Sequence, residues 1–95
     1  MELFIFARFH AAEGNEAALA ALLRDAAGRT RVEPGCLAIA AYRSLRDTRL
    51  FFIHSRWVDE AAFQTHADLA VTIGFAEAAQ KLIDHPLDVT RTTAL

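Results

Sequence analysis

The N-terminal segment ELFIFARFH, residues 2–10, constrains the fold most, because it is apolar on both faces of an extended chain. One face holds Leu3, Ile5, Ala7 and Phe9, and the other holds Phe4 and Phe6 before Arg8 and His10. Phenylalanine and isoleucine favour extended structure. A strand without a polar face is covered from both sides in the folded protein. The segment therefore predicts a strand over 2–10 with one packing layer on each side.

A helix is expected after this strand. Asn15 follows a glycine and is a favourable N-cap residue. Leucines and alanines then recur every three or four residues, which is the spacing of an amphipathic helix. Pro34 disfavours helical geometry at Glu33, so this helix is expected to fray by Val32. Pro34 and Gly35 together predict a turn.

The second half of the chain predicts a hairpin, more helix and a last strand. Segments 37–44 and 49–57 are expected to pair as a β-hairpin. Asp59 is a favourable N-cap, and apolar stripes at helical spacing continue from it to Asp84. After a proline, residues 87–93 alternate as a final strand.

The resulting order, β-α-β-β-α-β, is that of a ferredoxin-like α+β protomer, with both helical regions on one face of a four-stranded antiparallel sheet. Residues 1–95 make one domain. The opposite sheet face is also apolar, and hydrophobic residues make up 54% of the chain, against about 45–50% in an average soluble domain. We therefore expect a homodimer in which two sheets pack face to face.

Composition narrows the possible partners and the location. The formal net charge is −2 and the pI is near 6.0, without the basic clusters that bind nucleic acids. No apolar run approaches the ~20 residues that cross a bilayer, and the N-terminus does not resemble a signal peptide. The single cysteine, Cys36, cannot form an internal disulfide, which fits the cytoplasm. We expect a cytoplasmic protein that binds neither nucleic acid nor membrane.

Several segments resemble the antibiotic biosynthesis monooxygenase (ABM) family. They are EPGCLAIAAYRS at 33–44, Phe51, Trp57, DEAAFQTH at 59–66, Phe75 and HP at 85–86. The E-P-G-C turn and the W-x-D-x-x-A-x-x-x-H run are specific as a pair, and the resemblance covers essentially the whole chain. It implies a homodimeric α+β barrel with a pocket in each protomer between sheet and helices.

The same resemblance implies a class of chemistry. Characterised members often oxidise aromatic polyketides or quinols with O₂ and need no flavin, haem or metal, whereas others degrade haem. Many relatives carry Glu at the position of Ser55 and a second His at that of Val71. Haem-degrading members carry Asn on the first strand, where this chain has Ala7 nearby. Haem degradation is therefore not expected.

His66 is the candidate catalytic residue, as a base or hydrogen-bond partner for a hydroxyaromatic ligand. The alternative is a structural histidine bonded to a backbone carbonyl. The candidate substrate-binding residues are Trp57, Ser55, Phe51, Phe63 and Phe75. Trp57 is either a pocket wall or core filling, and the Ser55 hydroxyl could orient a ligand oxygen.

The expected function is a cofactor-independent monooxygenase or oxidase acting on a small hydrophobic phenol, quinol or anthrone-like compound with O₂. The alternatives are a non-catalytic dimeric protein that binds a small apolar ligand, and a structural dimer with a filled interior. No metal site is expected, because the four histidines show no H-x-x-x-H spacing and Cys36 stands alone.

Overall fold

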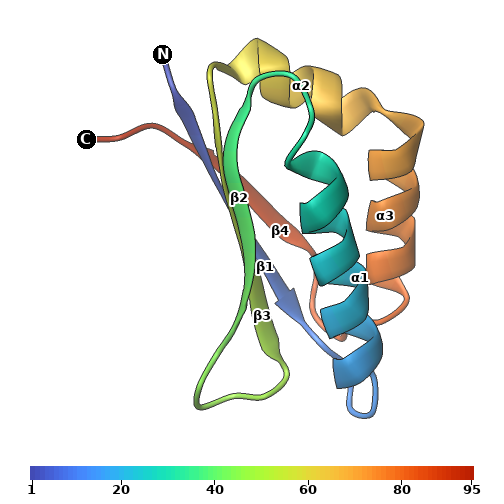
Figure 1. The fold of residues 1–95 in the computed structure, drawn as a ribbon. Helices are drawn as coiled ribbons and strands as arrows, with labels where there is room; N and C mark the ends of the chain where they lie inside the picture. The colour runs from blue at the N-terminus through green and yellow to red at the C-terminus, as the bar shows by residue number, and fades with distance from the viewer.

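The computed structural model describes residues 1–95. Its elements are β1 (Leu3–His10), α1 (Glu16–Thr30), β2 (Cys36–Arg43), β3 (Leu50–Trp57), α2 (Glu60–Asp68), α3 (Ala70–Gln80) and β4 (Asp88–Thr92). The four strands form one antiparallel sheet in the order β2-β3-β1-β4. Helices α1 and α3 lie on one face of the sheet, and α2 lies across one end (Figure 1). The predicted ferredoxin-like α+β protomer is confirmed.

The two central strands bury one face each against the helices. Burial alternates along both strands, so every second side chain of β1 and β3 is withdrawn from solvent. On β3 these residues are Phe51, Ile53, Ser55 and Trp57. Antiparallel pairing sets Ile5 of β1 beside Ser55. This face carries the core and, as described below, the floor of a cavity.

The opposite face of the sheet is uncovered in the isolated chain and carries exposed aromatic groups. Phe6 in β1 is 52% exposed and Tyr42 in β2 is 54% exposed. The ring centroids of Phe6 and His54 are 4.8 Å apart on this face. Large exposed aromatic groups in one layer are characteristic of an interaction surface.

The helical region expected over 59–84 is divided into two helices, and its end lies earlier than predicted. Leu69 has extended backbone angles, φ −66° and ψ 141°, between α2 and α3. Its N–H donates to the carbonyl of His66, and its own carbonyl accepts from Thr72 and Ile73. Leu69 thus ends one helix and begins the next, without the glycine or proline that would signal a break. The break brings the last turn of α2 beside the first turn of α3.

The predicted Pro34-Gly35 turn is confirmed, and it is pressed against α2. Gly35 has φ +83°, in the region that glycine occupies most easily. A Cβ placed on Gly35 would lie 2.6 Å from the Cβ of Ala62. The Gly35 carbonyl also accepts a hydrogen bond from Val58 N–H, over 2.9 Å. This close approach positions Glu33, two residues earlier, next to the C-terminal half of α2.

Helix α1 begins after Asn15, as predicted, but the side chain of Asn15 does not cap it. Its amide donates instead to the Leu82 carbonyl, over 3.4 Å. No helix in the structure has the length and apolar character needed to cross a membrane.

Candidate active site

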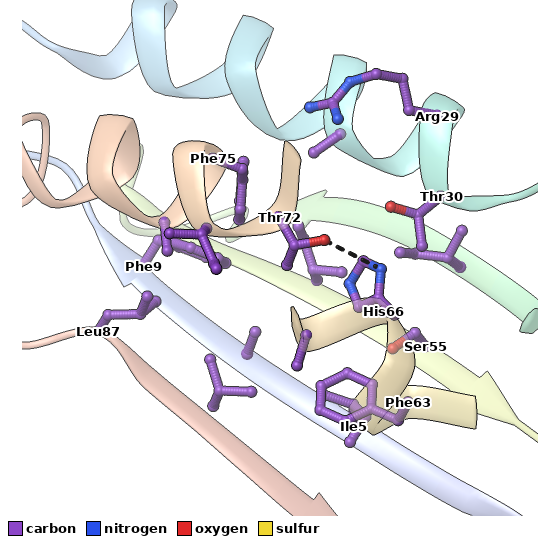
Figure 2. A pocket seen from close by; sticks show the side chains of 18 of the residues that line it. Ile5, Phe9, Arg29, Thr30, Ser55, Phe63, His66, Thr72, Phe75 and Leu87 are labelled. Carbon is purple, nitrogen blue, oxygen red and sulfur yellow. Dashed lines mark hydrogen bonds between the residues drawn. The ribbon is translucent and has the colours of Figure 1, made fainter. Parts of the chain in front are cut away.

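A cavity of about 510 Å³ lies between the sheet and the helices. Thirteen of its 21 lining residues are hydrophobic, which makes it a mostly apolar site of the size that small organic ligands occupy. Figure 2 shows Phe9 and Leu87 at one end of the cavity and His66, Thr30 and Ser55 at the other, where Phe63 and Ile5 also lie; Phe75 and Thr72 lie between the two ends. The end that holds His66, Thr30 and Ser55 is called the polar end.

His66 lies at the polar end of this cavity, in the last turn of α2. Its Nδ1 is 2.8 Å from Glu33 Oε1 and 3.4 Å from the Thr72 hydroxyl. The side chains of His66 and Glu33 are only 15% and 17% exposed. An ionised carboxylate can only accept a hydrogen bond, so Nδ1 carries the proton and the lone pair of a neutral ring is on Nε2. No protein group bonds Nε2, which leaves it free for a ligand.

Aromatic rings hold the imidazole of His66 in place. The ring centroids of Trp57 and Phe63 lie 4.9 Å and 5.6 Å from that of His66. Trp57 and Phe63 also pack edge to face, with centroids 5.6 Å apart. A side chain fixed by both packing and a carboxylate loses little freedom when a ligand binds.

The structure places Trp57 beneath the cavity instead of in its wall. Trp57 is fully buried and does not line the cavity. Its indole N–H donates to the Ser55 hydroxyl over 3.0 Å, and Ser55 does line the cavity. The Ser55 oxygen therefore accepts a hydrogen bond from Trp57, and the hydroxyl proton of Ser55 remains available for a hydrogen bond to a ligand oxygen.

The predicted phenylalanines divide into two groups. Phe63 and Phe75 line the cavity, as the substrate-binding assignment requires, whereas Phe51 does not. Phe51 is buried in the core, and the guanidinium of Arg43 lies 4.6 Å from the centre of its ring. Phe51 belongs to the same buried face of β3 as Ser55. The alternation of the sequence therefore could not tell a core residue from a residue that lines the cavity.

Sequence reasoning missed several polar residues of the site. Glu33 lies in the E-P-G-C turn, and its role depends on the docking of that turn against α2. Thr72 reaches His66 only because the helix breaks at Leu69. At the rim, Arg91 of β4 bonds Glu60 and Gln64 over 3.0 and 2.8 Å, and its guanidinium lies 4.9 Å from the ring centre of Phe63. Thr30 and Arg29 of α1 also line the cavity.

The structure separates the two positions that the family resemblance singled out, Ser55 and Val71. Ser55 lies on the cavity floor, whereas Val71 is 47% exposed on α3 and does not line the cavity. His66 is the only histidine in the lining. The remaining titratable groups there are Glu77, Arg29 and Arg91.

These features define a class: a ferredoxin-like α+β protein with an apolar cavity and one carboxylate-anchored histidine. The chain belongs to the antibiotic biosynthesis monooxygenase family, whose pattern matches residues 3–84. It is 32% identical over 63 residues to a Bacillus subtilis (strain 168) protein named "Putative monooxygenase YcnE", a match that spans 66% of each chain. The match is thus just under two thirds of that relative's length.

Solved structures agree on the fold. Rv0793 from Mycobacterium tuberculosis superposes with a TM-score of 0.92, at 24% identity, covering 100% of this chain and 96% of the other. A "putative antibiotic biosynthesis monooxygenase" from Deinococcus radiodurans has a TM-score of 0.91, at 27% identity, covering 97% and 91%. The names of the family and of the Bacillus subtilis and Deinococcus radiodurans proteins point to monooxygenase activity at the level of the family.

Proposed function

We propose that the protein is a monooxygenase that oxidises a small hydrophobic hydroxyaromatic compound, such as a phenol, quinol or anthrone, directly with O₂. The observation that supports this proposal best is the unbonded Nε2 of His66 at the polar end of a mostly apolar cavity, with Nδ1 of the same ring held by Glu33. A flat aromatic ring suits the part of the cavity that Phe75 and Phe9 line.

In the first step Nε2 of His66 accepts the proton of the substrate hydroxyl. The substrate becomes a phenolate and the ring of His66 an imidazolium, which the Glu33 carboxylate stabilises across 2.8 Å. The Ser55 hydroxyl lies on the same cavity wall and donates to a second oxygen of the substrate. General-base catalysis of this kind contributes about 10²- to 10⁴-fold in rate.

In the second step the electron-rich anion reduces O₂ by one electron, and the resulting radical pair forms a carbon–oxygen bond. The peroxide anion takes back the proton from His66. Loss of the ring-carbon proton then breaks the O–O bond and expels hydroxide, so that one oxygen atom enters a quinone carbonyl and the other leaves as water. A hydroxyaromatic and O₂ thus give a quinone and water, and the protein returns to its starting protonation state.

The test is O₂ uptake by chelator-treated protein with a panel of quinols and anthrone-like phenols, compared with His66→Gln and His66→Ala. We expect uptake well above substrate autoxidation in the wild-type protein and a loss of about 10²-fold or more in both variants. Circular dichroism and ligand binding by the variants show whether the fold and cavity persist.

A non-catalytic binding protein gives a different pattern. It would bind the same compounds, visible as quenching of Trp57 fluorescence beside the cavity, but uptake of O₂ would equal the background for every compound. That result, with a folded wild-type protein, would overturn the enzymatic proposal.

We also propose that the chain forms a homodimer through the outer sheet face, with Phe6 and Tyr42 at its centre. Both side chains are about half exposed in the single chain, at 52% and 54%. A second subunit that covers Phe6 and Tyr42 would give the sheet the second packing layer that the two-sided apolar sequence of β1 predicts. The cytoplasmic location stays a prediction that rests on the sequence.

A further inference from the structure

A second cluster of titratable side chains lies outside the cavity. It joins the end of β1, the turn between β2 and β3, and the connection between α3 and β4. His10 Nδ1 and His85 Nδ1 both lie 2.6 Å from Asp84 Oδ1. The two imidazole centroids are 4.5 Å apart. None of these three side chains lines the cavity.

His10 is the centre of this cluster and has a carboxylate at each ring nitrogen. Nδ1 faces Asp84, and Nε2 is 3.3 Å from Asp47 Oδ2. The His10 side chain is only 13% exposed. A neutral imidazole has one N–H and one lone pair, so one ring nitrogen of His10 can bind a cation while the other donates to a carboxylate.

Arg49 contacts both carboxyl groups of this cluster. Its backbone N–H donates to Asp47 Oδ1 over 3.0 Å. Arg49 also lies 3.6 Å from the second oxygen of Asp84, Oδ2, which directs the other oxygen toward the histidines.

We infer that His10, Asp84 and His85 form a binding site for a divalent transition-metal ion such as Zn²⁺. Two imidazole nitrogens and one carboxylate oxygen, all within 4.8 Å of one another, are the donor set that such ions take. Asp47 then accepts from His10 Nε2–H, as the outer carboxylate does behind many metal-bound histidines.

The geometry needs a small adjustment for an ion to enter. Ligand atoms around a tetrahedral Zn²⁺ are about 3.3 Å apart, given metal–ligand distances near 2.0–2.1 Å. The two Nδ1–Oδ1 separations of 2.6 Å would therefore open by less than about 1 Å. His85 can supply this movement, because its side chain is 57% exposed in the connection before β4.

Main-chain hydrogen bonds hold the end of β1 to the two connections that carry the other residues of the cluster. Asp84 N–H donates to the His10 carbonyl over 3.0 Å, and Ala11 N–H donates to the Arg49 carbonyl over 2.7 Å. A bound ion would tie the α3–β4 connection to β1, two residues before Leu87 enters the cavity wall. Metal binding would therefore raise the melting temperature by mass action.

The test is isothermal titration of chelator-treated protein with Zn²⁺, for the wild type, His85→Ala and the control His54→Ala. His54 is a partly buried histidine of β3 that contacts Phe6 and no carboxylate. We expect one Zn²⁺ per chain, at least about tenfold weaker binding in His85→Ala and an unchanged constant in His54→Ala. Asp84→Asn should weaken binding similarly, and only wild type and His54→Ala should melt at a higher temperature with Zn²⁺ present.

Two results would overturn the inference. One is the absence of saturable Zn²⁺ binding in folded wild-type protein. The other is binding of equal strength in wild type, His85→Ala and Asp84→Asn, which would place the ion elsewhere.

Discussion

The carboxylate of Glu33 lies 2.8 Å from Nδ1 of His66, although the two residues are 33 positions apart and belong to a turn and a helix. Docking of the Pro34-Gly35 turn on Ala62 of α2 brings them together. Because the carboxylate can only accept, it selects the tautomer with Nδ1–H and leaves Nε2 as the basic nitrogen. Glu33 is thus a positioning residue for the proposed base.

The first prediction concerns this pair. Glu33→Gln should lower kcat for O₂-dependent oxidation about 10- to 100-fold with little change in KM, because it removes orientation and charge stabilisation without touching the ligand. Nitrogen-15 NMR of the imidazole should show one Nδ1–H tautomer in the wild type and a mixture in the variant. Glu2→Gln, on the surface beside Arg56, is the matched control. An unchanged kcat and an unchanged tautomer in Glu33→Gln would contradict the role of Glu33.

The second prediction concerns the turn that carries Glu33. Gly35→Ala should lower the free energy of unfolding by about 1–3 kcal/mol, since an L-residue at φ +83° is strained and its Cβ meets Ala62 at 2.6 Å. Urea denaturation measures the change. Gly28→Ala in α1, with no atom within 4 Å of the new Cβ, should instead stabilise by roughly 0.5–1 kcal/mol. Equal stability of the two variants would show that the turn is not held against α2.

The fold was largely predictable from the sequence because its signals are local. The two-sided apolar pattern at 2–10, the Pro34-Gly35 turn and the alternation at 49–57 each depend on neighbouring residues. The break at Leu69 was not predictable in this way. It depends on carbonyl and N–H groups that bond across the junction and on packing of both helices against the sheet, and a leucine carries no turn signal.

The candidate site was predictable only in part, because it depends on contacts between elements that are far apart in the sequence. His66, Ser55, Phe63 and Phe75 line the cavity, but Phe51 and Trp57 are buried beside it on the same strand face as Ser55. Alternation assigns a face and does not distinguish a cavity wall from core. The partners Glu33 and Thr72 come from other elements, so only the tertiary structure reveals them.

The third prediction tests whether the cavity holds the ligand. Ala76 lines it from α3, so Ala76→Phe should fill part of the 510 Å³ and weaken ligand binding at least about tenfold. The loss of stability should be small, because the added ring enters open space instead of a packed core. Ala61→Phe, at an exposed position of α2, is the control and should bind normally. Normal binding by folded Ala76→Phe would place the ligand outside this cavity.

The fourth prediction uses Cys36, whose thiol pKa is raised above 9.0 by burial first and by the Glu33 carboxylate second. A raised pKa means less thiolate at a given pH, so iodoacetamide should react with Cys36 more slowly in the folded than in the unfolded protein at pH 8. The pH midpoint of the reaction should lie above 9.0. In Glu33→Gln the midpoint should fall, because one negative charge near the thiolate is removed. A midpoint that stays in place would mean that Glu33 is not ionised near Cys36.

The fifth prediction concerns the outer sheet face. Light scattering of the wild-type protein should give about twice the chain mass of 10.5 kDa, because pairing buries Phe6 and Tyr42. Phe6→Glu should yield a monomer, since a carboxylate loses its hydration in such an interface without gaining a partner. Leu45→Glu, fully exposed in the β2–β3 turn, makes the same chemical change away from the sheet face and should leave the dimer intact. A monomeric wild type, or a dimeric Phe6→Glu, would show that this face does not pair, and the exposed aromatic groups would then need another partner.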